Sequence, residues 1–261
     1  MWQVKTKLEF QLNRVYIYLY RKTTTLQKKV HTFASNLQRV SGSVKKGLTS
    51  RKRQPLAPLI FPKHLGILCY NSLPPGFSKT ITEEIARNIH SFFYSMRDLE
   101  VWDLPPHFFE KDVRQRKRAS KDYLLHSTKK FFSLSHKIGQ LSRTNIIIAF
   151  TDWPIYSSHH KNAEFLFGEA NRELGVSIVS LAPLREDFYG RESDDQLFLE
   201  RVLKVTMHEL GHQILRNFNH CCDPTCVLSF AKDIEAVDCR RMSFCVTCQD
   251  KIEKLRVAFN L

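Results

Sequence analysis

A long helix is predicted over the stretch SDDQLFLERVLKVTMHELGH, residues 193–212. Ser193 can cap this helix with Gln196 three positions on, and Asp194 and Asp195 add negative charge at the positive end of the helix dipole. One stripe of the helix then carries Leu199, Val202, Leu203, Thr206 and Leu210. The pattern predicts a capped, amphipathic helix that packs on an apolar core.

Two histidines of this helix, His208 and His212, are four residues apart. On a helix, that spacing places both imidazoles on one face, about one turn apart, where they can bind the same tetrahedral zinc ion. Glu209 follows the first histidine and can act as general base on a water molecule that the metal activates. The motif therefore predicts a catalytic zinc ion, in the arrangement of a metal-dependent peptidase.

A third ligand is expected beyond the end of the helix, which we predict at residues 217–219, where asparagine can turn the chain back. His220 follows directly and is the candidate. Two interpretations stay open, because a histidine in a polar turn is often a surface residue that titrates near neutrality.

Six of the seven cysteines lie between Cys221 and Cys248. Cys221 and Cys226 form one pair, and Cys245 and Cys248 form a second pair after an interval of eighteen residues. Two thiolate pairs at these separations predict a closed, four-cysteine structural zinc site rather than a disulfide scaffold.

The two other cysteines of this segment, Cys222 and Cys239, are spare in this assignment. Either can be a small buried residue, and Cys222 can compete with Cys221 for the ligand role.

The residues before the motif alternate between strand and helix patterns, which predicts an α/β core. Strands are expected at 65–70, 99–102 and 145–150, with two neighbouring strands at 165–170 and 176–181 that end the sheet. Helices are expected from about Thr80, whose spacing to Glu83 suits a capping box, to Phe92, and from Ala119 to Phe132. A loop is expected at 73–76.

The formal net charge of +14 is concentrated near the start of the chain. Up to Arg53 there are thirteen lysines and arginines against the single acid Glu9, and a proline-containing linker follows. We predict a basic extension over 1–54 and one folded domain over 55–261. The extension is interpreted as an organellar targeting segment, a membrane-surface or nucleic-acid contact, or a solvated arm.

No run of about 18 apolar residues is present and the start lacks the pattern of a secretory signal. The expectation is therefore a soluble, intracellular protein without a transmembrane segment.

From Leu56 to the C-terminus the sequence resembles the archaemetzincins, zinc metallopeptidases of the metzincin clan. The resemblance lies in four pieces that occur in the family's order, namely 167–170 (FGEA), 179–181 (VSL), 208–212 (HELGH), and His220-Cys221 with the four-cysteine spacing. It implies a mixed, twisted sheet packed on an active-site helix, with a small four-cysteine zinc subdomain at about 221–261.

By the same resemblance, two zinc ions are expected, one catalytic and one structural. The implied ligands of the first are His208, His212 and His220, with Glu209 as general base, and those of the second are Cys221, Cys226, Cys245 and Cys248. A peptide or protein substrate would lie extended along the strand at 165–168.

This sequence departs from the family at three positions. Leu215 stands where the family has a glycine, Phe218 stands at the place of its third histidine, and His220 follows two residues later. Leu228 replaces a methionine, which is a swap of similar volume that should still pack beneath the metal. Leu215 resists the backbone angles that glycine permits, so the usual tight turn is not expected.

Hydrolysis of peptide bonds is therefore the predicted activity. The alternative is a catalytically impaired zinc-binding module of the same fold. The sequence disfavours a nucleic-acid binder built on the four-cysteine segment and the basic arm, because few aromatic residues accompany the basic residues in the cysteine region. The oligomeric state stays unknown.

Overall fold

The computed structural model describes Phe61 and residues 63–70, 77–102, 113–118, 121–157, 159, 163–216 and 219–261. The predicted basic extension at 1–54 and the predicted loop at 73–76 lie outside these residues, and the boundary near residue 55 stays a prediction.

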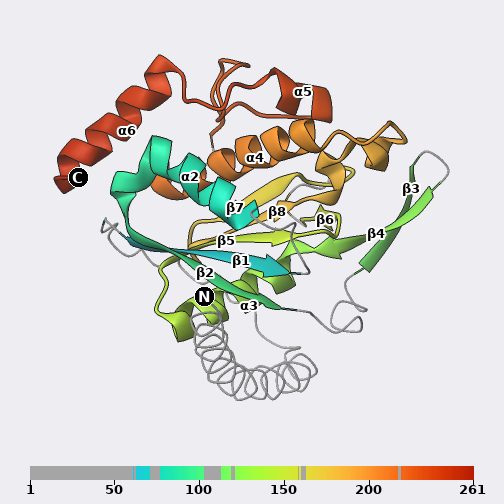
Figure 1. Cartoon of the computed structure of the whole chain (residues 1–261), viewed down its shortest axis with the longest axis horizontal. Helices are drawn as coiled ribbons and strands as arrows, with labels where there is room; N and C mark the ends of the chain where they lie inside the picture. Colours follow the sequence, from blue (N-terminus) through green and yellow to red (C-terminus); the bar gives the residue numbers. More distant parts are fainter. Residues whose placement is uncertain are drawn as a thin grey trace, which may run out of the picture. The chain divides into compact units, whose positions relative to one another are not determined.

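A five-stranded mixed sheet forms the centre of the molecule (Figure 1). Its strands, in spatial order, are β2 (Phe93–Trp102), β1 (Lys63–Tyr70), β5 (Ile146–Thr151), β8 (Val176–Ser180) and β7 (Gly168–Asn171). The first four run parallel, and β7 pairs antiparallel with β8 at the edge of the sheet. The predicted α/β class with a mixed sheet is confirmed, as is the pair of neighbouring strands that ends it.

A second sheet contains β3 (Val113–Arg118), β4 (Lys121–Ser127) and β6 (Ile155–Tyr156). The predicted helix at 119–132 is therefore wrong in its first half, because β3 and β4 pair antiparallel and the helix α3 (Thr128–Ser142) begins only after them.

The reason for this error lies in the side-chain pattern of β4. Leu124 is exposed while Leu125 and His126 are buried, so the burial of this strand does not follow a simple alternation that the sequence could reveal. Lys121, Leu124 and Leu125 on β4 have good helix propensity, and pairing with β3 overrides that propensity.

Helices cover both faces of the central sheet, with α3 on one face and α2 and α4 on the other (Figure 1). The remaining helical elements are α2 (Phe77–Ile89), η1 (His90–Phe92), η3 (Ala182–Leu184), η4 (Glu186–Tyr189), α4 (Asp195–Leu215), α5 (Ile234–Cys239) and α6 (Val246–Phe259). No helix in the described part of the chain is both long enough and apolar enough to cross a membrane.

The start of α2 differs from the prediction. Thr80 lies inside this helix, which begins at Phe77, so Thr80 and Glu83 do not form a cap. The helix also ends at Ile89, and Phe92 belongs to the short turn η1. Both Ile89 and Phe92 are fully buried in the core, which explains why they share one apolar pattern.

Helix α4 is the central element of the core. Its N-cap is Asp194, whose side chain accepts a hydrogen bond from the backbone N–H of Leu197, so the predicted cap at Ser193 is one residue too early. Every residue from 201 to 214 is buried, because β7 and β8 pack on one side of α4 and α2, α5 and α6 pack on the other. The helix is thus buried all round rather than amphipathic.

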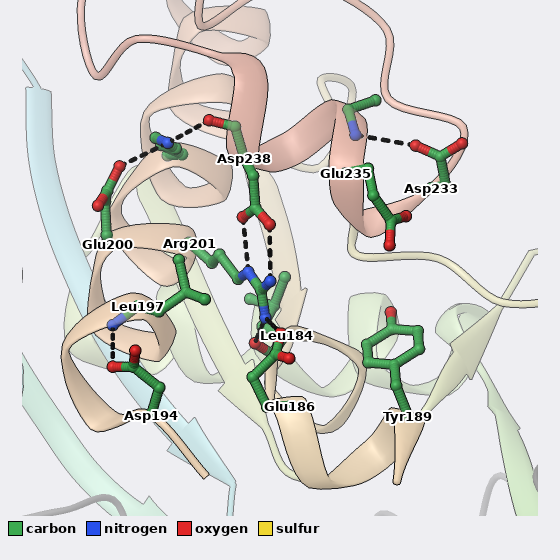
Figure 2. A network of polar contacts seen from close by, with 12 residues as sticks. Leu184, Glu186, Tyr189, Asp194, Leu197, Glu200, Arg201, Asp233, Glu235 and Asp238 are labelled. Atoms are coloured by element: carbon green, nitrogen blue, oxygen red, sulfur yellow. Dashed lines mark hydrogen bonds and ion pairs between the residues drawn. The ribbon is translucent and has the colours of Figure 1, made fainter. Parts of the chain in front are cut away.

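Polar contacts join α4 to the C-terminal segment (Figure 2). The buried guanidinium of Arg201 donates two hydrogen bonds to Asp238 of α5, at 2.6 and 2.7 Å, and pairs with Glu186 of η4 at 2.5 Å. The ammonium of Lys204 donates to the backbone carbonyl of Asp238 at 2.9 Å. These contacts fix α5 on the helix that carries the HELGH motif.

Candidate metal centres

Three histidine side chains converge in the structure. His208, His212 and His220 each offer one ring nitrogen, and these atoms lie within 4.8 Å of one another. His208 and His212 come from neighbouring turns of α4, while His220 comes from the loop that follows it. The three residues predicted from the sequence are therefore brought together, including the one that departs from the family's spacing.

The orientation of His208 suits a metal ligand. Its Nδ1 donates to the backbone carbonyl of Val227 at 2.8 Å, which leaves Nε2 facing Nε2 of His212 at 3.1 Å. Two nitrogens of a tetrahedral zinc site stand about 3.3 Å apart, given zinc–nitrogen bonds of about 2.0–2.1 Å. Burial, with the nearby His212 as a further cause, lowers the pKa of His208, which favours the neutral form that binds metal.

The backbone around Cys221 brings His220 to the site. The backbone N–H of Cys221 donates to the carbonyl of Leu228 at 2.8 Å, and Cys221 forms an isolated parallel bridge with Ser229. Helix α4 ends at Leu215, earlier than predicted, and Arg216 takes the left-handed conformation with φ 47°. Leu215 stands where the family has a glycine, and the left-handed residue in this chain is Arg216, one position later.

Glu209 is buried beside the edge strand β7. A Cβ atom placed on Gly168 would lie 2.5 Å from Oε1 of Glu209, so only glycine leaves room for this carboxylate. Burial and, to a smaller extent, the charge of Glu169 raise the pKa of Glu209 to about 8, against the opposing charge of Arg240. Burial in turn lowers the pKa of Arg240 to about 10.

Polar side chains hold α4 against β7 and β8. Gln213 donates from Nε2 to the carbonyl of Asn171 at 3.2 Å and to the hydroxyl of Ser177 at 3.1 Å. Ser177 donates to the carbonyl of Glu209 at 3.3 Å. These contacts fix the distance between Glu209 and the sheet edge.

Leu228 packs against the helix that carries the histidines, as the sequence predicted for a residue beneath the metal. It is buried, and a Cβ atom on Gly211 would lie 2.5 Å from its Cδ2 atom. Gly211 in the HELGH motif therefore permits close packing of Leu228.

Four cysteines form a second cluster. The Sγ atoms of Cys221, Cys226, Cys245 and Cys248 lie within 4.8 Å of one another, and those of Cys221 and Cys245 are 3.6 Å apart. The backbone N–H groups of Leu228 and Cys245 donate to Sγ of Cys226 at 3.5 and 3.4 Å. Four sulfurs with backbone donors on one of them are the donor set of a structural zinc site.

The spare cysteines lie outside this cluster. Cys222 and Cys239 are both exposed, so the expectation that either is a small buried residue is wrong. Of the two neighbours, Cys221 rather than Cys222 belongs to the cluster.

Several residues near the site were not singled out from the sequence. The carbonyl of Val227 orients His208, Arg240 is buried near Glu209, and Phe230 is 64% exposed with its ring 5.2 Å from that of His220. A backbone acceptor has no sequence signature. Phe230 stands close to the apolar residues Val227 and Leu228, so the sequence does not distinguish it as an exposed residue.

The part of the chain that carries the histidine group and the cysteine group is similar to a known peptidase family. Residues 139–254 match Peptidase family M54, and this match includes all eight predicted site residues. The predicted resemblance to the archaemetzincins, a class of zinc metallopeptidases, is thereby confirmed over the part of the chain that carries both groups.

Individual archaemetzincins are also similar to this chain in sequence. The chain is 33% identical to an archaemetzincin of Thermococcus kodakarensis over 47% of its own length and 63% of that protein's. It is 42% identical to an archaemetzincin of Pyrococcus horikoshii over 34% of its length and 47% of that protein's. The chain thus spans about half to just under two thirds of the length of these relatives.

A solved structure supports the fold. The crystal structure of archaemetzincin from Methanopyrus kandleri superposes with a TM-score of 0.56 at 21% identity, and the match covers 74% of this chain and 94% of that one.

Proposed function

We propose that this protein is a zinc-dependent metallopeptidase in which His208, His212 and His220 bind the catalytic zinc ion and Glu209 is the general base. The observation that supports this most directly is the convergence of three imidazole nitrogens within 4.8 Å of one another. The buried carboxylate of Glu209 lies on α4, the helix that also carries His208 and His212. Three histidines leave the fourth position of a tetrahedral ion open, as a catalytic site requires.

Zinc in this site would polarise the scissile carbonyl and lower the pKa of a water molecule toward about 7. Glu209 accepts the proton of the attacking water and then transfers it to the leaving amine. Burial raises the pKa of Glu209, and a zinc ion beside it would favour the ionised carboxylate that accepts this proton. Gly168 supports the role, since its missing side chain leaves the carboxylate in place.

The substrate binds as an extended peptide along β7. This strand ends the order of the central sheet and pairs only with β8 among the described strands, so its outer edge offers backbone hydrogen-bonding groups. Gly168, at its first position, touches Glu209, so a peptide added here passes the proposed base. Strand β7 begins at Gly168, and residues 165–167 of the predicted edge precede it.

The four cysteines hold a second, structural zinc ion in this proposal. Their sulfurs come from both ends of the segment 221–248, so the ion would join the loop that carries His220 to the start of α6. That arrangement supports a role in positioning His220, the histidine next to Cys221 in the chain.

Two variants test this function. Glu209→Gln should keep bound zinc and the fold and lose about 10² to 10⁴ in peptide cleavage rate, the usual contribution of a positioned base. His220→Ala should lose zinc at the histidine group together with activity. Cleavage of a peptide library is measured beside bound metal for both variants and for the wild type.

Wild-type protein with full zinc occupancy that cleaves no peptide would contradict the peptidase and favour the catalytically impaired binding module. If His220→Ala retains zinc as tightly as the wild type, His220 is not a ligand.

A further inference from the structure

A cavity of about 400 Å³ opens beside the histidine group. Its lining includes His212 and His220, so an occupant would lie next to the proposed catalytic zinc ion. The side chains of Leu215 and Leu255 supply apolar wall, from α4 and α6 respectively. The cavity therefore has the size and position to receive a substrate side chain close to the scissile bond.

Two lysines give this cavity a positive charge. Lys251 and Lys254 both line it, and they lie three residues apart on α6, which places them on one face of that helix. Neither forms an ion pair with a described residue, and no aspartate or glutamate of the described residues lines the cavity. Helix α6 carries two acids, of which Glu253 pairs with Arg256 at 3.0 Å, and Asp250 forms no ion pair with a described residue.

The cationic groups are thus left for a ligand. An ammonium on a flexible stem suits a carboxylate that arrives in variable geometry, and the two leucines suit the methylene groups that carry such a carboxylate. A neutral or basic side chain would leave the two charges without a partner. Discrimination by charge is therefore built into this side of the site.

We propose that Lys251 and Lys254 make this cavity a subsite for a peptide carboxylate next to the scissile bond. The proposal rests on the peptidase function proposed above and specifies its substrate class. The carboxylate has two sources, an acidic side chain or the free C-terminus of a short peptide, and the experiment separates them.

Binding is measured on the zinc-loaded full chain carrying Glu209→Gln, so that the result does not depend on turnover. In one series of peptide pairs, the two members differ only in Glu or Gln at one position around a central alanine pair, and the series covers each position in turn. The members of a further pair differ only in a free or amidated C-terminus. The carboxylate peptide should bind about 5- to 20-fold more tightly at low salt, as expected of two exposed ion pairs. This preference should decrease as the salt concentration rises.

Lys251→Gln with Lys254→Gln should abolish the preference, and Lys251→Glu with Lys254→Glu should reverse it toward a lysine-containing peptide. The matched control removes two exposed lysines elsewhere, Lys79→Gln on α2 and Lys129→Gln on α3, and should keep the preference. Both α6 lysines are exposed, so the variants should keep their zinc content and melting temperature.

Equal binding of the carboxylate and neutral peptides, or no binding of either, would overturn the subsite. So would a preference that survives both α6 variants. Wild-type cleavage of both peptides with equal binding refutes the subsite alone. A carboxylate preference without any cleavage refutes the peptidase function and leaves the anion-binding cavity established.

Discussion

At the scale of single residues, the contact between Glu209 and Gly168 determines where the proposed base lies. The carboxylate fills the space that any other residue at position 168 would need. Glu209 lies in the HELGH motif and Gly168 lies in the FGEA segment. The sequence indicated a chemical role for Glu209 but none for Gly168. Their contact could not be predicted because it depends on the packing of α4 against β7, and no local pattern encodes the distance between two elements.

Gly168→Ala should therefore displace the carboxylate while leaving the metal ligands in place. We expect zinc content to be unchanged and the peptide cleavage rate to fall about 10²-fold, since a misplacement of about 1 Å has that effect on a positioned group. The measurement is the cleavage rate per bound zinc ion.

Gly139→Ala is the matched control. This glycine of α3 is also crowded, with Ile147 and a backbone carbonyl 3.0 Å from an added Cβ atom, and α3 lies on the opposite face of the sheet. It should lower the melting temperature without changing the rate per folded molecule. A Gly168→Ala protein of full activity would show that Glu209 can move without cost.

The buried Glu209 also predicts a pH dependence of stability in metal-free protein. Its pKa is about 8 in the folded state against an ordinary value of 4.5, so between these values the folded state binds a proton that the unfolded chain does not. Stability is thus lost as pH rises from about 5 to 8. Each pKa unit corresponds to about 1.4 kcal/mol, which makes the loss a few kcal/mol.

Glu209→Gln cannot lose this proton, so the melting temperature of the metal-free variant minus that of metal-free wild type should increase across this pH range and then level off. Titration of the histidines is common to both proteins and cancels in the difference. A difference that stays constant from pH 5 to 9 would mean that Glu209 remains ionised in the metal-free site.

At the scale of elements, the sequence patterns identified the strands and helices that are buried in the core. The buried strands β1 and β5 and the helix α4 have apolar patterns that follow from burial, and each was predicted close to its observed position. Strand β4 was predicted as part of a helix because its residues suit a helix locally, and it becomes a strand only through pairing with β3. Helix ends differed by a few residues, since Asp194 and Arg216 took the capping positions that Ser193 and residues 217–219 were expected to fill.

Arg201 joins α4 to η4 and α5 through ion pairs, and removing its charge should weaken the packing of these three elements. Arg201 is 1% exposed and makes ion pairs with both Glu186 and Asp238. Arg201→Met leaves Asp238 without its ion-pair partner and leaves Glu186 with the longer contact to Arg191 at 3.4 Å. We expect it to lower the free energy of unfolding by about 3 kcal/mol. Chemical denaturation measures this change.

Lys79→Met is the comparison, because it removes one partner of an exposed pair with Glu83 and should cost about 0.5 kcal/mol or less. Arg201→Lys keeps the charge but loses the two-pronged contact with Asp238, so its stability should lie between wild type and Arg201→Met. Equal stability of Arg201→Met and wild type would mean that α5 is held on α4 by apolar packing alone.

At the scale of the whole molecule, the two candidate metal centres share one short segment. His220 and Cys221 are adjacent in the chain yet belong to different groups, so the loop after α4 joins both. The sequence predicted, from spacing and resemblance, all seven residues that the structure gathers into the two candidate centres. It indicated that His220 comes two residues late, and the structure accommodates this shift through Arg216 and the pairing of Cys221 with Leu228 and Ser229. Such compensation involves backbone contacts, which sequence patterns do not report.

The two centres should differ in how firmly they hold zinc. The histidine group includes the exposed His220 and leaves a coordination position open, whereas the cysteine group includes Cys226 at 1% and Cys248 at 3% exposure and uses four thiolates. We expect two zinc ions per chain, of which a chelator removes one first, together with peptidase activity. Metal analysis during chelation measures both steps.

Variants of the histidines and cysteines show which centre loses its zinc ion first. His208→Ala with His212→Ala should leave one firmly bound ion and a folded protein. Cys226→Ala should lower both zinc content and the melting temperature sharply, because a closed zinc site contributes folding free energy and its ligands span the C-terminal segment. Cys222→Ala and Cys239→Ala are the matched controls, since both cysteines are exposed and lie outside the cluster, and each should retain two ions. A single firmly bound ion that the histidine variants leave unchanged would contradict the two-ion arrangement, and it would place the metal in the cysteine group alone.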